Sequence, residues 1–211
     1  MNENTISYTL LAVILAYMIG SVPTGLWLGL WLRGTDIRQH GSHNIGATNT
    51  LRVLGKPMGF TALSCDIGKG LAAVILGAVI SPWPYAPMVC GLTAILGHTF
   101  SLFVRFRGGK GVATSAGVFL GLCPLPVLAA LAVFILVVLL SHMVSAGSCA
   151  AAVTLCATVW LISDTWLSTP MPPLPSSMVL RVVVTVVAAL VVIKHHGNLR
   201  RIINGTENRL W

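Results

Sequence analysis

Residues 97–114 read GHTFSLFVRFRGGKGVAT, a polar, cationic and glycine-rich stretch set between long apolar runs. Gly108, Gly109 and Gly111 surround Lys110, and without Cβ atoms they let the backbone approach a ligand closely with its N–H groups turned inward. An ammonium group among such amides suits an oxyanion. The stretch departs from the Walker A pattern, because Val104 stands where that pattern has its first glycine and no Ser or Thr directly follows the lysine. It therefore predicts an anion-binding loop of another kind.

Arg105 and Arg107 precede this loop and leave two interpretations open. Either they anchor a loop on the cytoplasmic side of a membrane, or their guanidinium groups contribute to the same anion site. For Lys110 the ligand interpretation is favoured, since a membrane anchor does not need glycines around it.

The chain as a whole has the composition of a membrane protein. Of its 211 residues, 55% are hydrophobic and only 9% are charged, and the mean hydropathy is +0.87. Because a membrane span needs about 20 mostly apolar residues, this length allows roughly six or seven helices joined by short loops in a single domain, residues 1–211. The first apolar run lacks a basic region before it and is too long for a signal sequence, which predicts a retained helix.

Seven apolar runs are predicted to span the membrane. They cover residues 5–32, 58–80, 86–103, 112–123, 127–140, 148–166 and 178–193. The fourth is short and is ended by Pro124 and Pro126, and a polar break at 141–145 separates the fifth from the sixth. The stretch 169–177 is rich in proline and is predicted to be a surface loop.

Two spans carry features that plain lipid-facing helices lack. Pro23 lies between Gly20 and Gly25, which predicts a kink or a close helix contact in the first span. Asp66 and Lys69 are three residues apart on one face of the second. Charges inside a span are costly and are usually paired or functional, so these two form either a structural ion pair below the membrane surface or part of a site.

A second polar segment, residues 33–57, contains GSHNIGATN at 41–49 with Arg52 just beyond it. Small residues for close approach, hydroxyl and amide donors and a guanidinium group together predict another oxyanion cradle. Ser42 is a candidate nucleophile, but no nucleophile-elbow pattern surrounds it, so a hydrogen-bonding role is favoured.

The C-terminal tail adds a third polar group. His195 and Asn198 are three apart and can face one ligand together on a helix, although a histidine at a membrane surface is often only an anchor.

Counting spans from a periplasmic N-terminus places 33–57, 104–111, 141–147 and the C-terminal tail on one side. Every Lys and Arg except Arg181 lies in or near these loops, which identifies that side as the cytoplasm.

Five motifs together resemble one family. They are GSVPTG at 20–25, GSHNIGATNTLR at 41–52, DIGKG at 66–70, GHTFSLFVRFRGGKGVAT at 97–114 and HHGNLRR at 195–201. In type, order and spacing they are similar to the bacterial acyl-phosphate:glycerol-3-phosphate acyltransferases, the PlsY family, and the resemblance covers nearly the whole chain.

The resemblance implies an all-α integral enzyme of the bacterial inner membrane. We expect about seven transmembrane helices, a periplasmic N-terminus, a cytoplasmic C-terminus and a monomer surrounded by membrane lipid, with the active site facing the cytoplasm. The implied reaction moves a fatty acyl group from acyl phosphate to the 1-hydroxyl of glycerol 3-phosphate, without a cofactor. Its products are lysophosphatidic acid and phosphate, and it is an early step of phospholipid biosynthesis.

Site residues follow by matching positions in the motifs. The resemblance implies a catalytic set of Ser42, Arg52, Lys110, His195 and Asn198. Further contacts to substrate or phosphate are expected from Asn44, Thr48, Asn49, Gly108, Gly109, Gly111, Ser145 and Ser148. Which of the two last serines faces substrate is left open, as is whether His195 acts as general base or as phosphate ligand. His195 is assigned instead of His196 because it keeps the spacing to Asn198. No metal site is predicted, since the acidic residues are few and scattered.

Three competing function classes are weighed against this one. A transporter for an organic phosphate or another anion would explain broken helices and the charges at 66 and 69, but no internal repeat is present and the polar groups gather at one face. A scaffold for anionic lipid explains the basic loops only. Nucleic-acid binding is disfavoured because no basic surface interleaved with aromatic residues lies outside the membrane.

Overall fold

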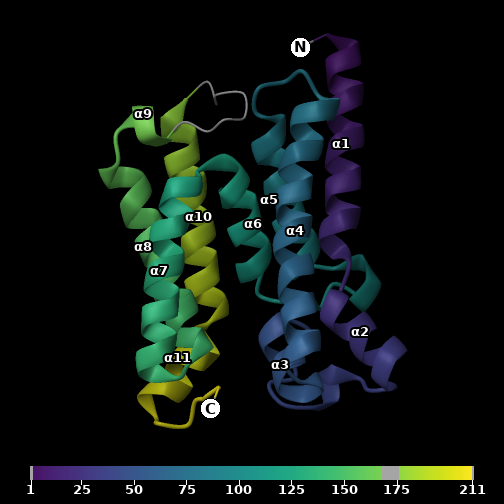
Figure 1. Cartoon of the computed structure of the whole chain (residues 1–211). Coiled ribbons are helices and arrows are strands. Elements are labelled where there is room, and N and C mark those ends of the chain that lie inside the picture. Colours follow the sequence, from purple (N-terminus) through teal and green to yellow (C-terminus); the bar gives the residue numbers. More distant parts are fainter. Residues whose placement is uncertain (1, 168–175, 211) are drawn as a thin grey trace. The chain divides into compact units, whose positions relative to one another are not determined.

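Helices and short 3-10 turns are the only regular elements in residues 2–167 and 176–210, which are the residues that the computed structural model describes. Figure 1 traces the chain. It divides into two compact units, Met1–Leu122 and Cys123–Trp211, which are described one at a time. The expectation of one domain covering residues 1–211 stays a prediction.

In the first unit, long helices pack through small residues. Its elements are α1 (Glu3–Ser21), α2 (Thr24–Arg33), η1 (Ile37–Gln39), α3 (Ala47–Leu54), α4 (Lys56–Ile80), α5 (Ala86–Thr99), η2 (Leu102–Val104) and α6 (Val112–Leu122). Helices α1, α4 and α5 run side by side and α6 packs on α4 and α5 (Figure 1). The core between the first three is built from Ala12, Ala16, Ala73, Cys90 and Ala94. Small side chains let helix backbones approach closely, which is the main source of packing energy in lipid.

The structure has both a helix break at Pro23 and a close helix contact beside it, the two features that the sequence suggested there. The first apolar run is divided into α1 and α2, with Val22 and Pro23 between them, because proline removes a backbone donor. At Gly20 the helix contact is so close that an added Cβ would overlap the backbone of Ala94 on α5. The break turns α2 away from α1 and toward the polar segment that contains α3.

The second unit consists of α7 (Pro124–Ser141), α8 (Val144–Leu161), α9 (Asp164–Leu167), α10 (Ser177–Lys194) and α11 (His196–Ile203). Helix α8 packs against both α7 and α10. Arg181, the basic residue that departed from the sidedness pattern, lies on α10 and donates to the carbonyl oxygen of Val159 at 2.9 Å and to the carboxylate of Asp164 at 2.6 Å. It therefore links α10 to the end of α8 and to α9.

Two expected boundaries are wrong. The fourth span ends where expected, because α6 stops at Leu122 and Cys123 separates it from α7. The next span begins earlier than expected, since Pro124 and Pro126 lie in the first turn of α7, where the first N–H groups of a helix have no intrahelical acceptor and proline is tolerated. The break predicted at 141–145 is limited to His142 and Met143, so Ser145 lies inside α8. Of the predicted loop at 169–177, residues up to 175 lie outside the described part of the chain, and its last residue, Ser177, begins α10.

Membrane-spanning character is confirmed by helix length and composition. Among the described residues, six apolar helices are long enough to cross a bilayer: Glu3–Ser21, Lys56–Ile80, Ala86–Val104, Pro124–Ser141, Val144–Leu161 and Ser177–Lys194. Helix α6 is apolar but has only 11 residues. The all-α multi-pass architecture is therefore established, whereas the count of seven spans and the side of each terminus stay predictions.

Candidate functional site

The glycine-rich loop begins with an unusual backbone turn. After η2, Arg105 and Phe106 both have positive φ, 53° and 62°, a region that side chains rarely adopt. The N–H of Phe106 donates to the carbonyl oxygen of Ser101 at 2.8 Å, which closes the turn. Such strain persists only where surrounding contacts enforce it, and it is often found at functional sites.

Beyond this turn the loop lies on the end of α5. The N–H of Gly108 donates to the carbonyl oxygen of Thr99 at 3.1 Å, and that of Gly109 donates to the carbonyl oxygen of His98 at 3.0 Å. A Cβ at position 108 would overlap the backbone of α5, and one at 109 would overlap the His98 ring. The sequence predicted that these amides turn toward a ligand. In the structure they bind the last carbonyl groups of α5, so the two glycines fix the shape of the loop.

The backbone N–H groups that are available to bind an anion lie after the loop, at the start of α6. Gly111 has a φ of 78°, and its carbonyl oxygen accepts the first helical bond, from the N–H of Ser115 at 2.7 Å. The first four N–H groups of a helix have no intrahelical partner and carry its positive dipole end, which suits anions. Lys110 stands immediately before them. Thr114 and Ser115 add buried hydroxyl oxygens without hydrogen-bond partners among the described residues, a signal that motif reading missed.

Asn49 organises the second polar segment from inside. Its side chain is buried, and its Oδ1 accepts the N–H of Ser42 at 2.8 Å. Its Nδ2 donates to the carbonyl oxygens of Ile37 and Asn44, both at 2.8 Å. The amide is thus used within the loop, so the geometry gives Asn49 a structural role and does not support its predicted contact with substrate.

The neighbours of Asn49 remain at the surface of this segment. Ser42, Asn44, Thr48 and Arg52 are half-buried. The Oδ1 of Asn44 accepts the N–H of Gly46 at 2.9 Å, which shapes the turn before α3. No basic side chain among the described residues accepts a hydrogen bond from the Ser42 hydroxyl, which agrees with a hydrogen-bonding role instead of a nucleophilic one.

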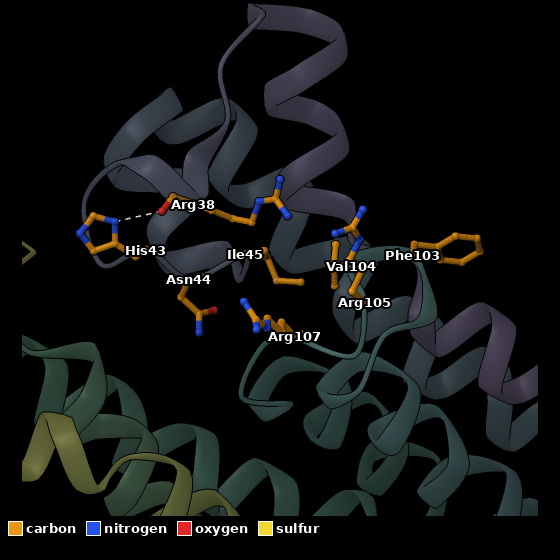
Figure 2. A pocket seen from close by; sticks show the side chains of 9 residues that line it. Arg38, His43, Asn44, Ile45, Phe103, Val104, Arg105 and Arg107 are labelled. Carbon is orange, nitrogen blue, oxygen red and sulfur yellow. Dashed lines mark hydrogen bonds between the residues drawn. The ribbon is translucent and has the colours of Figure 1, made fainter.

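A cationic pocket joins the two segments. It has a volume of about 660 Å³ and is lined by Arg38, His43, Asn44, Ile45, Phe103, Val104, Arg105, Arg107 and Gly108. Figure 2 shows these side chains around the cavity, which the polar segment before α3 and the turn after η2 form together. Arg38 is paired with Asp36 at 2.7 Å, whereas no acidic side chain of the described residues pairs with Arg105 or Arg107. This placement favours the ligand interpretation of these two arginines over the anchor interpretation.

In the second unit, His195 occupies the junction of α10 and α11. It is buried, and its Nδ1 lies 2.8 Å from the carbonyl oxygen of Val191. A carbonyl group only accepts hydrogen bonds, so Nδ1 carries the proton and, in the neutral ring, Nε2 is an acceptor. This tautomer is the one that a general base requires at Nε2, whereas a contact to a phosphate oxygen requires the protonated ring, in which Nε2 donates.

Asn198 and Ser145 meet at a residue that the sequence analysis did not select, Glu207. Oε1 of Glu207 accepts hydrogen bonds from the Asn198 amide at 2.6 Å and the Ser145 hydroxyl at 2.7 Å, and Oε2 pairs with Arg201 at 2.8 Å. Burial alone would raise the pKa of Glu207, but the bonds from Asn198, Ser145 and Arg201 outweigh it and hold the pKa below its usual value. The carboxylate is therefore charged and fixes the tail on α8.

The two serines of α8 differ in their bonds. Ser145 reaches Glu207, whereas the hydroxyl of Ser148 donates to the carbonyl oxygen of Val144 in its own helix at 2.8 Å. Both lie in the first two turns of α8. This corrects the expectation for Ser145, which was placed in the break at 141–145, whereas Ser148 was expected in the sixth span and lies in a helix as predicted.

The predicted catalytic set thus falls into two groups. Ser42, Arg52 and Lys110 belong to the first unit, and His195 and Asn198 belong to the second. Among residues 2–167 and 176–210, no three His, Cys, Asp or Glu side chains lie together as metal ligands would.

Comparisons with known proteins cover nearly the whole chain. The profile of the family described as glycerol-3-phosphate acyltransferase matches residues 10–205. A glycerol-3-phosphate acyltransferase of Streptococcus equi subsp. equi is 41% identical, with 94% of this chain and 91% of the relative covered. One of Trichlorobacter lovleyi is 44% identical, with 92% and 93% covered.

Two solved structures are similar in fold as well as in sequence. Both are crystal structures of PlsY (YgiH), described as an integral membrane glycerol 3-phosphate acyltransferase. Its glycerol 3-phosphate form is 32% identical with a TM-score of 0.82, and its lysophosphatidic acid form is 31% identical with a TM-score of 0.80. Each comparison covers 95% of this chain and 94% of the solved chain.

Proposed function

The chain belongs to the glycerol-3-phosphate acyltransferase family, and from that membership we propose how this membrane enzyme acts and which residues act. It is a multi-pass membrane acyltransferase for glycerol 3-phosphate. We propose acyl phosphate as the donor, so that the products are lysophosphatidic acid and inorganic phosphate. The observation that carries the proposal is the cationic pocket between two anion-suited segments, together with the absence of an activated nucleophile at Ser42 among the described residues.

Acyl phosphate suits such a site because it needs no covalent enzyme intermediate. The 1-hydroxyl oxygen of glycerol 3-phosphate attacks the acyl carbon, and the bond from that carbon to the phosphate oxygen breaks. Phosphate leaves with the bonding electron pair, and the proton of the hydroxyl passes to a base. An enzyme then has to hold two anions together and stabilise developing charge, which positioning and electrostatic donors achieve.

The first unit supplies the electrostatic part in this proposal. Lys110 and the first amides of α6 hold phosphate oxygens, and Arg52 offers a forked guanidinium for another pair. Ser42 donates a hydrogen bond to the substrates. Donors of this kind contribute about 3 to 4 kcal/mol each to an acyl-transfer transition state.

The second unit supplies orientation and a proton acceptor. In the tautomer set by Val191, Nε2 of His195 is an acceptor, so as general base it takes the hydroxyl proton directly. In the alternative role the ring is protonated, Nε2 donates to a phosphate oxygen, and a substrate phosphate oxygen takes the hydroxyl proton. Asn198, held by Glu207, orients glycerol 3-phosphate beside His195.

A pH-rate profile separates the two roles of His195. Loss of the pH dependence in His195→Asn supports the base, and a raised KM with an unchanged profile supports the ligand.

We place this site at the cytoplasmic face of the bacterial inner membrane, with the acyl chain among the lipid-facing helices and the enzyme as a monomer. The support is the concentration of Lys and Arg in the loops that carry the site residues. The transporter alternative was supported mainly by the intramembrane charges of Asp66 and Lys69. These two side chains form an ion pair with each other at 2.7 Å, so they do not require a transported ion as partner.

The test is acyl transfer by the purified enzyme in lipid vesicles. Labelled glycerol 3-phosphate is supplied with either palmitoyl phosphate or palmitoyl thioester, for the wild type, Lys110→Ala and the exposed control Lys56→Ala. We expect lysophosphatidic acid from palmitoyl phosphate with the wild type and the control, and a loss of about 100-fold or more in Lys110→Ala. Product from the thioester alone would overturn the proposed donor, and full activity of Lys110→Ala would overturn the assigned loop.

A further inference from the structure

A buried polar network lies beneath the glycine-rich loop and has no part in the mechanism above. It consists of Asp66 and Lys69 on α4 and His98 on α5, with 3%, 7% and 6% of their surfaces exposed. The Lys69 ammonium lies 2.7 Å from Oδ1 of Asp66 and 2.8 Å from Nδ1 of His98, and it donates to the carbonyl oxygen of Val22 at 2.9 Å. The ammonium thus has hydrogen-bond partners in Val22 and His98 and an ion-pair partner in Asp66, whose Oδ1 has no hydrogen-bond partner among the described residues. This pairing explains how a charge is kept inside a membrane span.

These contacts fix the proton of the His98 ring. The Lys69 ammonium only donates, so Nδ1 of His98 accepts, and the ring proton lies on Nε2. Asp66 does not compete for Nδ1, because the distance of 3.7 Å is too long for a hydrogen bond. His98 is thus held as the Nε2–H tautomer, the opposite of the tautomer found at His195.

The Nε2 edge of the ring supports the glycine-rich loop. It fills the space that a Cβ at Gly109 would need, and the N–H of Gly109 donates to the carbonyl oxygen of His98 at 3.0 Å. Both the side chain and the backbone of His98 therefore contact the residue that precedes Lys110.

The other end of the network reaches toward the second polar segment. Val22 is the residue at the break between α1 and α2, and Lys69 binds its carbonyl group, which has lost its helical partner. On α2, a Cβ at Gly25 would overlap both Oγ1 of Thr50 and the carbonyl oxygen of Ile45. Helix α2 thus packs directly on the segment that carries Ser42 and Arg52.

We propose that Asp66, Lys69 and His98 form a positioning network that sets the glycine-rich loop at a fixed place relative to the segment of residues 41–52. His98 acts on the reaction through Lys110 and does not touch substrate. The inference rests on the proposed role of Lys110 in binding phosphate. The proposed network explains how the DIGKG motif at 66–70 contributes to catalysis, since the mechanism proposed above assigns no role to these residues.

The first test is the tautomer, read from the ring nitrogen shifts of the wild type labelled with ¹⁵N-histidine in lipid. The His98 signal is identified by its absence in His98→Asn. We expect a protonated Nε2 and an unprotonated Nδ1. A proton on Nδ1 would overturn the proposal, and this result does not depend on any activity.

The second test is a double-mutant cycle with Lys110. In His98→Asn, the new side-chain oxygen stands near the old Nδ1 and still accepts from Lys69, while the edge beneath Gly109 is removed. We expect kcat to fall about tenfold in the wild-type background but less than twofold in Lys110→Ala, since the effect passes through Lys110. His98→Gln, whose amide reaches the Nε2 position, should recover part of the loss.

The control is Thr93→Val on the same helix, where the hydroxyl donates to the carbonyl oxygen of Val89 and has no other partner in the part of the chain that the structure describes. Its kcat should stay within twofold of wild type. Equal losses from His98→Asn in both backgrounds would indicate a merely structural role and would overturn the proposal, as would a kcat of His98→Asn within twofold of wild type. A wild type without acyl transfer from any donor would instead overturn the proposed function, and the tautomer would still decide whether the network has the proposed geometry.

Discussion

The hydroxyl of Ser145 donates a hydrogen bond to Oε1 of Glu207 at 2.7 Å, across 62 positions of sequence and between two buried side chains. The same oxygen accepts the Asn198 amide, and Leu210 N–H donates to the carbonyl oxygen of His142 at 2.7 Å nearby along the tail. The C-terminal tail is thus folded back onto the start of α8, and one carboxylate determines where Asn198 lies.

Replacing this carboxylate should therefore affect both stability and activity. In Glu207→Gln the charge-assisted bonds to Arg201 and Asn198 are lost or weakened, and each bond to a charged group contributes about 1.5 to 3 kcal/mol. We expect a lower Tm and at least a tenfold loss of acyl transfer. Glu3→Gln is the control, because Glu3 is the only other glutamate and is exposed. Wild-type activity in Glu207→Gln would contradict the assigned role of the carboxylate.

Acid should remove the contribution of Glu207. Its pKa in the folded enzyme lies below the usual 4.5, despite the opposing effect of burial, because of its bonds to Asn198, Ser145 and Arg201. A carboxyl with a lowered folded pKa stabilises the fold above its unfolded pKa, and this stability is lost as the pH falls through the folded value. The difference in Tm between wild type and Glu207→Gln should be constant near neutral pH and should shrink below pH 4.5. A difference that does not change with acid would show that the charge is unimportant.

Features that depend on residues close together in the chain could be predicted from the sequence. Apolar runs located the helices, and Pro23 located the break between α1 and α2. The spacing of Asp66 and Lys69 anticipated their ion pair. Each of these depends on residues near one another in the chain, so pattern and period are enough to predict them.

Other features depend on the tertiary fold and were missed for that reason. The fifth span begins at Pro124 and not at Val127, because proline is tolerated in the first turn of a helix. An asparagine in a polar loop can face a ligand or its own backbone, and only the fold shows that Asn49 does the latter. Glu207 was missed because its partners on α8 and α11 come together only when the tail folds back. The amides of Gly108 and Gly109 likewise found acceptors at the end of α5.

The contact between α4 and α6 allows a matched pair of substitutions. At Gly70 an added Cβ would overlap the carbonyl oxygen of Thr114, whereas at Gly68 no atom lies within 4 Å of one. Gly70→Ala should destabilise the enzyme by about 1 to 3 kcal/mol through overpacking and should lower activity by moving the start of α6. Gly68→Ala should be neutral or should stabilise α4 by up to about 1 kcal/mol. Thermal unfolding in detergent measures both, and equal Tm values would contradict the close contact.

The two serines of α8 can be separated in the same way. Ser145→Ala removes one donor from the buried carboxylate of Glu207, which should cost about 1 to 3 kcal/mol and reduce acyl transfer. Ser148→Ala removes only a bond to the carbonyl oxygen of Val144, which keeps its helical partner, so we expect a change of less than about 0.5 kcal/mol and near-normal activity. If Ser148→Ala is instead the more damaging change in steady-state kinetics, Ser148 is the serine that faces substrate.

Arg107 lines the pocket between η2 and the segment before α3, and its two possible roles, membrane anchor and substrate binding, predict different kinetics. A membrane anchor affects insertion and topology, whereas a guanidinium that attracts an anionic substrate affects KM and makes it dependent on salt. Arg107→Gln should therefore raise KM for acyl phosphate or glycerol 3-phosphate by about tenfold, leave kcat nearly unchanged and weaken the salt dependence of kcat/KM. Arg33→Gln is the control, since Arg33 is an exposed arginine like Arg107 but lies at the end of α2 and does not line the pocket. A normal KM with reduced insertion would identify Arg107 as an anchor, and the pocket would then have to bind its anion through Arg105 and the neighbouring polar groups alone.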